Sequence, residues 1–127
     1  MSLAPIPWPL SIVILSHNRK DALESSLTGL LSIVDEFGCE LVVVDNASTD
    51  GSAVVISLAA AGCPNFIVLL NDRNLGVAGG RNVGWRAARR DFILNIDDDT
   101  IVTADAVAAM LSVLRRHPEV GIVSPRI

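Results

Sequence analysis

Three consecutive aspartates, Asp97, Asp98 and Asp99, form an acid triplet with the clearest chemical potential in this 127-residue sequence. Adjacent carboxylates repel one another, and hard divalent cations such as Mg²⁺ prefer oxygen ligands, usually one or two carboxylates together with substrate phosphates. A solvated surface run is the simpler explanation of such a triplet. The apolar residues 92–96 favour the cation, because they place the triplet at the mouth of a buried strand. The pattern therefore indicates a site for a divalent cation.

Other polar residues follow the remaining apolar runs or begin the helical segments after them. They are Ser16, His17, Asp45 and Arg81. In an open α/β sheet ligands bind outside the carboxyl ends of the strands, so these side chains are expected to surround one site. His17 could line the site or stack near a base. Arg81 at a helix start could meet a phosphate, although the glycines before it fit a flexible loop equally well.

The strands that must position these residues are short apolar runs, mostly rich in Val, Ile and Leu. Strands that are apolar throughout are typical of a parallel sheet covered on both faces. Five runs fit this pattern, at residues 10–15, 41–44, 66–70, 92–96 and 120–123.

Helical patterns lie between these runs, with apolar residues at helical spacing. The first helix is expected to start at Asn18, the second at Ser48 or Asp50, and the fourth at Thr103. The third is expected to span roughly residues 80–90. The order β-α-β-α-β-α-β-α-β predicts a Rossmann-like, doubly wound α/β fold with a mainly parallel sheet. The chain stops after the fifth expected strand, which suggests a truncated sheet from a larger protein.

Composition disfavours several classes of protein. The formal net charge of −4 argues against a nucleic-acid-binding protein, which would present a basic face. No apolar run approaches the ~18 residues of a membrane span, and no secretory signal is visible. Cys39 and Cys63 lack the spacing of a metal site and are expected to be free thiols in a reducing compartment. The sequence thus predicts a cytoplasmic chain with no membrane segment and no nucleic-acid partner.

Several familiar nucleotide and phosphate motifs are missing. The first expected strand is not followed by the G-x-G-x-x-G of dinucleotide-binding folds, and no G-K-[ST] follows the glycines at 76–84. Ile101 stands where the D-x-D-x-T pattern of aspartyl phosphatases needs threonine. A nicotinamide cofactor, a P-loop and an aspartyl phosphatase are therefore disfavoured.

Four segments of the sequence, taken in order, form a more specific pattern than any one of them alone. They are LSIVILSHNR at 10–19, VVVDNASTDGS at 42–52, NLGVAGGRNVG at 74–84 and IDDD at 96–99. Together they resemble the nucleotide-sugar-binding part of a family 2 glycosyltransferase, which has the GT-A fold. The resemblance covers nearly everything from residue 10 to residue 126.

The resemblance implies a nucleotide-binding role for the residues after the first two strands. Ser16 and His17 would line the pocket of the base. Asp45 would contact the base, commonly uracil or thymine, through its ring N–H. Arg81 would lie near the donor phosphates or the base.

In the acid triplet, the resemblance implies that Asp97 or Asp98 reaches the ribose or the sugar. Asp99, with Asp97 in the same D-x-D element, would bind Mn²⁺ or Mg²⁺ on the diphosphate. The implied reaction is a metal-dependent, inverting transfer of a sugar from a nucleoside diphosphate sugar, such as a UDP- or dTDP-sugar, to an acceptor hydroxyl. The acceptor would be a glycan or a lipid-linked molecule in polysaccharide or cell-surface glycan synthesis.

The resemblance also sets the expected extent of the domain. Residues 1–9 would be an N-terminal extension that could include vector-derived residues at 1–3. Residues 10–127 would be the nucleotide-sugar-binding portion of a GT-A domain without its acceptor-side half. The catalytic base would lie beyond Ile127, so this chain alone would be inactive. The parent protein could act at the inner face of the membrane. A non-catalytic nucleotide-sugar or metal-binding module and a metal-dependent phosphotransferase or receiver-like domain stay open as alternatives.

Overall fold

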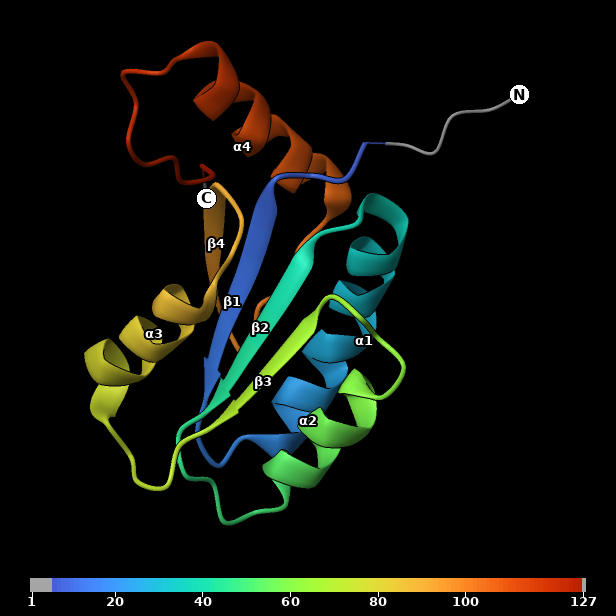
Figure 1. The fold of residues 1–127 in the computed structure, drawn as a ribbon, viewed down its shortest axis with the longest axis vertical. Helices are drawn as coiled ribbons and strands as arrows, with labels where there is room; N and C mark the ends of the chain where they lie inside the picture. The colour runs from blue at the N-terminus through green and yellow to red at the C-terminus, as the bar shows by residue number, and fades with distance from the viewer. Residues whose placement is uncertain (1–5, 127) are drawn as a thin grey trace.

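The structure, a computed structural model that describes residues 6–126, is built around one parallel sheet (Figure 1). Within these residues the sheet has four strands in the order β3-β2-β1-β4. The strands are β1 (Leu10–Ser16), β2 (Glu40–Asp45), β3 (Phe66–Leu70) and β4 (Phe92–Asp97), and the helices are α1 (Lys20–Phe37), α2 (Ser52–Ala60), α3 (Gly76–Ala87) and α4 (Ala104–Arg116). No helix among the described residues is both long and apolar enough to cross a bilayer.

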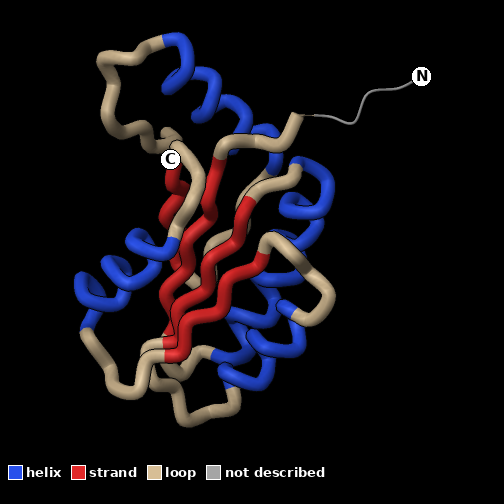
Figure 2. Tube along the Cα trace, in the orientation of Figure 1, coloured by secondary structure: helices blue, strands red, loops and turns tan. Residues whose placement is uncertain are grey.

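Helices cover both faces of the sheet (Figure 2). On one face α1 and α2 enclose the larger core, to which α4 adds Val107 and Leu111 near the end where the strands begin. On the other face α3 packs across β1 and β2 over a smaller cluster of Val13, Val42 and Val44. The predicted α/β class and the doubly wound topology are therefore confirmed.

The strands differ in burial according to their place in the sheet. The side chains of β1 and β2, the two central strands, are buried almost throughout, as expected for strands covered on both faces. In β4, which is an edge strand of the described sheet, burial alternates, so that Ile93 is exposed while Ile96 is buried. The expectation that the acid triplet follows a fully buried strand was therefore wrong.

The fifth strand predicted at residues 120–123 does not form, and residues 117–126 contain neither helix nor strand. A strand is stable only when its backbone N–H and C=O groups find a partner, and this segment pairs with no strand of the described chain. Val123 instead borders a small cavity beside Phe92 and Leu114. The strand was predicted from apolar composition alone, and composition does not show whether a neighbouring strand is available for pairing.

Three helix boundaries also differ from the prediction, and the first is that of α2, which has Gly51 rather than Ser48 or Asp50 at its N-cap. α3 spans Gly76–Ala87 rather than roughly residues 80–90. α1 has Arg19 rather than Asn18 at its N-cap, and the Arg19 side chain makes no capping hydrogen bond. Asn18 instead has a left-handed backbone with φ 51°, and its side-chain oxygen accepts a hydrogen bond from the backbone N–H of Thr49 at 2.7 Å. The loop after β1 is therefore tied to the loop after β2.

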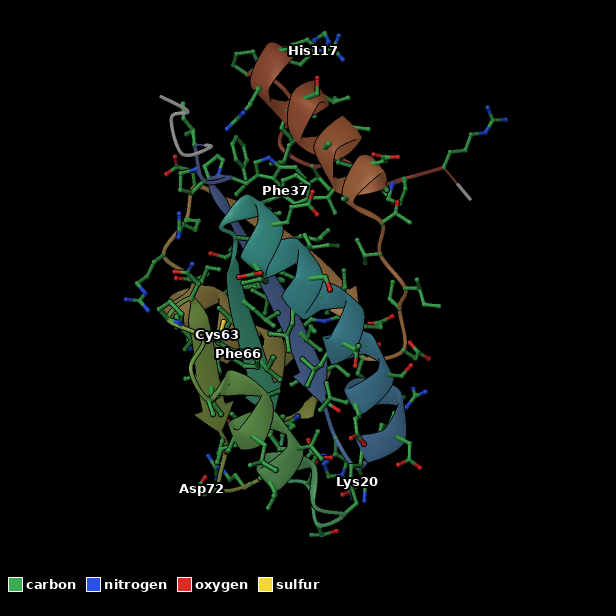
Figure 3. The ribbon with its side chains drawn as sticks, turned by 90° about the vertical axis from the view of Figure 1, so that its right-hand side faces the viewer. Lys20, Phe37, Cys63, Phe66, Asp72 and His117 are labelled. Atoms are coloured by element: carbon green, nitrogen blue, oxygen red, sulfur yellow. The ribbon has the colours of Figure 1, made fainter. Side chains whose placement is uncertain are left out.

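The predicted N-terminal extension is only partly described, because residues 1–5 lie outside the described residues. Trp8 stacks on Phe37, the last residue of α1, with ring centroids 4.0 Å apart. The backbone N–H of Trp8 also donates to the Phe37 carbonyl at 2.9 Å. Trp8 is thus a packing residue, as predicted, at the end of the molecule where Figure 3 labels Phe37.

Cys39 is a buried free thiol directly before β2. Burial raises the pKa of the Cys39 thiol to about 11, so almost no thiolate is present near neutral pH. We expect Cys39 to resist the thiol reagent DTNB in the folded protein and to react once the chain is unfolded in urea. A Cys39→Ser variant separates its signal from that of Cys63. Rapid labelling of Cys39 in native buffer would contradict this expectation.

Candidate functional site

The carboxyl ends of β1 and β2 lie toward the bottom of Figure 1, and the carboxyl end of β4 lies beside that of β1 in the strand register. In the strand register Ser16 of β1 lies beside Asp45 of β2, and Leu15 of β1 lies beside Asp97 of β4. The strand order reverses between β1 and β4, and ligands bind in open α/β sheets at such a point. Figure 3 shows Lys20 and Asp72 at this end of the molecule, opposite Phe37.

An open cleft of about 390 Å³ lies at this end of the sheet, between the start of α3 and the end of β4. Polar groups from all three strand ends contribute to its walls. Its lining residues are Leu15, His17, Arg19, Asn46, Asn74, Gly76, Val77, Asp97, Asp98 and Asp99.

The three carboxylates of the acid triplet have different environments. The side chain of Asp98 is only 7% exposed, whereas those of Asp97 and Asp99 are 66% and 51% exposed. The Ser16 hydroxyl donates to Asp98 Oδ2 at 2.9 Å, and the Ser26 hydroxyl of α1 donates to the Asp98 carbonyl at 2.7 Å. Asp98 is therefore held within the protein by two serines, whereas the carboxylates of Asp97 and Asp99 are exposed to solvent.

Two arginines compensate the charge of the acid triplet. Arg81 Nη2 of α3 lies 2.8 Å from Asp97 Oδ1. Arg19 Nη2 lies 3.0 Å from Asp99 Oδ2, and its Nη1 lies 3.6 Å from Asp98 Oδ1. The repulsion expected between adjacent carboxylates is thus relieved by a guanidinium group on each side.

Asp45 and Arg81 each contain a buried polar atom that no group within residues 6–126 satisfies. Asp45, at the end of β2, is 3% exposed, and its Oδ2 accepts a hydrogen bond from the backbone N–H of Ser48 at 3.1 Å. Its Oδ1 lacks a donor, and Arg81 Nε lacks an acceptor. An unsatisfied buried group costs about 1–3 kcal/mol, so such atoms indicate where a ligand would supply the missing partner.

The ring of His17 is oriented by two neighbours. Its Nδ1 lies 2.8 Å from the carbonyl oxygen of Asn46, and because a carbonyl only accepts, Nδ1 carries a proton and donates it. Its Nε2 lies 3.3 Å from the side-chain nitrogen of Asn18, which donates. The ring therefore has a fixed orientation on the exposed rim of the cleft.

Asn46, directly after β2, organises the loop that leads into α3. It is 3% exposed, and every hydrogen-bonding position of its side chain is used. Nδ2 donates to Asn74 Oδ1 at 2.9 Å and to the Gly76 carbonyl at 3.1 Å. Oδ1 accepts from Asn71 Nδ2 at 3.1 Å and from the Leu75 backbone N–H at 2.9 Å. One amide thus sets the start of α3 relative to the sheet.

Replacing Asn46 by aspartate should destabilise the protein by about 2–3 kcal/mol, because both donations are lost and a carboxylate then faces two acceptors. The free energy of unfolding in urea measures this change. Asn82→Asp, an exposed substitution on α3, introduces the same charge and is the control. Equal stability of the two variants would contradict the role of Asn46.

Asp50 also serves the loop structure. Its carboxylate accepts hydrogen bonds from the Ser52 hydroxyl and from the backbone N–H groups of Lys20 and Ser52, at 2.9 Å and 3.0 Å for the backbone pair. These bonds, that of the Ser52 hydroxyl foremost, hold the pKa of the Asp50 carboxyl below its usual value. Asp50 therefore joins the starts of α1 and α2.

The predicted site residues are brought to one end of the sheet, but not to one surface. His17 and the acid triplet line the cleft, and Ser16 lies beneath them through its bond to Asp98. Asp45 and Arg81 are not among the residues that line the cleft. Asp45 is buried at the end of β2, whereas Arg81 lines a second cavity together with Asp97 and Thr100.

Sequence reasoning missed Arg19, Asn46 and Ser26 as parts of the site. For Arg19 a signal existed, since it belongs to the same loop as His17 and three crowded carboxylates need a nearby positive charge. Asn46 also follows a strand end directly. Ser26 lies inside a helix, where nothing in the sequence distinguishes it.

The acid triplet offers oxygen ligands without forming a closed cage. In the described part of the chain, no three acidic, histidine or cysteine side chains converge to hold a metal ion. The exposed carboxylates of Asp97 and Asp99 nevertheless fit the kind of Mg²⁺ or Mn²⁺ site in which one or two carboxylates act together with substrate phosphates. Such an ion would take its remaining ligands from the substrate.

Comparison with known sequences identifies related proteins that are longer than this chain. It is 29% identical over 114 residues to an uncharacterized glycosyltransferase of Haemophilus influenzae, covering 90% of this chain and 37% of that protein. It is 28% identical over 120 residues to the poly-β-1,6-N-acetyl-D-glucosamine synthase of Staphylococcus aureus, covering 93% of this chain and 29% of that protein. The chain thus spans about a third of the length of these relatives.

Solved structures share the fold. The mannosyltransferase PcManGT from Pyrobaculum calidifontis, in complex with GDP-Man and Mn²⁺, superposes with a TM-score of 0.74 at 25% identity, over 88% of this chain and 34% of that one. TarS of S. aureus in complex with UDP-GlcNAc superposes with a TM-score of 0.73 at 23% identity, over 86% of this chain and 32% of that one. The fold is therefore that of the GT-A glycosyltransferases.

The sequence profile described as glycosyl transferase family 2 matches residues 11–127, nearly the whole chain. This match covers all four segments on which the resemblance was based. The chain therefore belongs to glycosyl transferase family 2.

Proposed function

We propose that this chain is the donor-binding part of an enzyme that transfers a sugar from a nucleoside diphosphate sugar to an acceptor hydroxyl. Membership of glycosyl transferase family 2 supports the reaction class. The name of the S. aureus relative supports a glycan acceptor in cell-surface polysaccharide synthesis. In this proposal residues 10–127 form the nucleotide-sugar-binding portion, and the acceptor is a glycan or a lipid-linked molecule. The reaction takes place in the cytoplasm or at the inner face of the membrane.

The unsatisfied buried oxygen of Asp45 carries this proposal, and the unsatisfied nitrogen of Arg81 is a second observation that supports it. Asp45 Oδ1 needs a donor and Arg81 Nε needs an acceptor, and both are buried. Uracil, thymine and guanine each carry a ring N–H that would donate to Asp45 Oδ1, and a carbonyl or phosphate oxygen of the same nucleotide would accept from Arg81 Nε. Cytosine and adenine present an accepting ring nitrogen instead, and would leave Asp45 unpaired. The site therefore favours a UDP- or dTDP-sugar, with GDP-sugars as the third possibility.

Ser16, His17 and Asp98 complete the nucleotide side of the proposed site. His17, fixed on the rim of the cleft, would stack near the base or line its pocket. Asp98, held by Ser16 and Ser26, would accept from the ribose or the sugar at the edge of the cleft. Arg81 would meet the base through Nε or the phosphates through its outer nitrogens.

A divalent cation on Asp99 and Asp97 would complete the diphosphate side. Both carboxylates are exposed toward the cleft, and the N-terminus of α3 at Gly76 forms another wall of it. Helix N-termini and cations both favour a diphosphate. When bound, the cation would neutralise charge that develops on the departing diphosphate. The Mn²⁺ in the PcManGT structure supports this assignment, with Mg²⁺ as the alternative ion.

The remaining component is a carboxylate base that takes the proton of the acceptor hydroxyl as it attacks the anomeric carbon with inversion. We place this base beyond Ile127. The 127-residue chain is then expected to bind a nucleotide without transferring sugar.

The test is calorimetric titration of this chain with UDP, dTDP, GDP and CDP, each with and without Mn²⁺. Tighter binding of UDP, dTDP or GDP in the presence of Mn²⁺, and weaker binding of CDP, would support the proposal. Asp99→Ala should remove the dependence on Mn²⁺. Absence of binding by all four nucleotides would overturn it. Turnover of a nucleotide sugar onto an added acceptor by this chain would overturn the placement of the base.

A further inference from the structure

We propose that Arg19 alternates between two partners, the acid triplet when no cation is bound and the donor diphosphate when one is. This inference rests on the proposed function and assigns a further ligand-binding residue to it. Its basis is that Arg19 Nη2 lies 3.0 Å from Asp99 Oδ2, on one of the two carboxylates proposed to hold the cation.

The guanidinium group of Arg19 lies where a divalent metal ion would bind the acid triplet. It extends from the N-cap of α1 across the end of the sheet to β4, where its two outer nitrogens reach different carboxylates. The shorter contact, 3.0 Å, is to Asp99 Oδ2 on the exposed member of the pair. A guanidinium carries no lone pair that could join a coordination shell, and its positive charge repels a cation on the same carboxylate, so a cation that binds Asp99 favours the departure of Arg19.

The exchange requires little free energy. The Arg19 side chain is 53% exposed and that of Asp99 is 51% exposed. Ion pairs in such positions contribute little to stability, because water and salt screen them. Asp98 would not be stranded by the departure of Arg19, since the Ser16 hydroxyl continues to donate to its Oδ2.

The released guanidinium remains next to the place where the diphosphate would bind. Arg19 lines the same cleft as the acid triplet and the start of α3. The planar fork of donors on arginine matches two oxygens of one phosphate group. Arg81 is less available for this exchange, because its guanidinium is more buried than that of Arg19. Cation binding and diphosphate binding would therefore assist one another through Arg19.

The test compares Arg19→Gln with the unsubstituted chain by calorimetry, first with Mn²⁺ alone and then with UDP, dTDP or GDP in saturating Mn²⁺. A unit charge about 5 Å from a divalent ion in water changes its affinity about tenfold, so the variant should bind Mn²⁺ alone up to about tenfold more tightly. With Mn²⁺ present, the variant should bind the nucleotide about tenfold more weakly, because a charged donor to phosphate is lost.

Arg115→Gln is the matched control, since it removes the same charge from an exposed position on α4. It should change neither affinity. Weaker or unchanged Mn²⁺ binding by Arg19→Gln would overturn the inference, because it would mean that Arg19 merely holds Asp99 in place. Unchanged nucleotide binding would overturn the second half of the exchange. If the unsubstituted chain binds none of the three nucleotides with Mn²⁺, the proposed function fails, which is a distinguishable result.

Discussion

Asparagine at position 45 is expected to lower the affinity of the chain for its nucleoside diphosphate about 100-fold, because it leaves a buried donor facing the ring N–H of the base. The backbone N–H of Ser48 donates to Asp45 Oδ2 at 3.1 Å and would hold the single oxygen of the asparagine. The amide nitrogen must then take the place of Oδ1, the atom without a partner. The amide N–H of the asparagine would then face the ring N–H of the base, so binding is weakened while the fold is kept.

The same substitution should improve the binding of CDP relative to UDP, since cytosine presents an accepting ring nitrogen to the new amide. Titration of both nucleotides in Mn²⁺ measures the two changes together. Asp35→Asn, on the exposed side of α1, removes an identical charge away from the strand ends and should leave both affinities unaltered. Undiminished UDP binding by Asp45→Asn would show that the base does not contact this carboxylate.

Valine in place of Gly84 is expected to destabilise the protein by about 3 kcal/mol or more, because it overfills a closely packed interface. A Cβ atom at this position would lie 2.6 Å from Val13 Cγ1 and 3.1 Å from Val44 Cγ2. Both valines are fully buried in the central strands, and branched side chains cannot turn aside there. α3 would have to move away from the sheet, carrying Arg81 with it.

Urea unfolding followed by circular dichroism gives the stability of this variant. Gly29→Ala is an informative control, because a Cβ atom on that helical glycine meets nothing within 4 Å. It should stabilise α1 by about 0.5–1 kcal/mol through helix propensity, a change of opposite sign. Similar unfolding midpoints for Gly84→Val and the unsubstituted chain would contradict the close approach of α3.

The parts of the fold that could be predicted from sequence are those in which local pattern and tertiary environment agree. β1 and β2 lie at the centre of the sheet and are buried almost throughout, and their apolar runs located the ends of both strands to within one residue. Residues 120–123 have the same composition but no partner strand among the described residues. Strand pairing depends on two segments, so the pattern of one segment cannot predict whether it will pair.

The candidate site shows the same division. Asp45 and the acid triplet follow strand ends, where residue type and position suffice to select them. Arg19 matters because it meets Asp99, 80 residues further along the chain. Asn46 matters because its four bonds reach a loop about 25 to 30 residues away. Such roles depend on distances across the folded molecule, which one sequence does not contain.

The place of β1 between β2 and β4 has a consequence for how such a site can diversify. The group proposed to read the base ends β2, the groups proposed to hold the cation follow β4, and one strand keeps them apart. Apart from Arg81, which pairs with Asp97 and is also proposed to meet the base, these groups are separated, and separated groups contribute almost independently to the binding free energy. A descendant of this domain could therefore change its base while keeping its cation, or the reverse, one substitution at a time. Related proteins that keep this fold could therefore differ in the nucleotide that they bind.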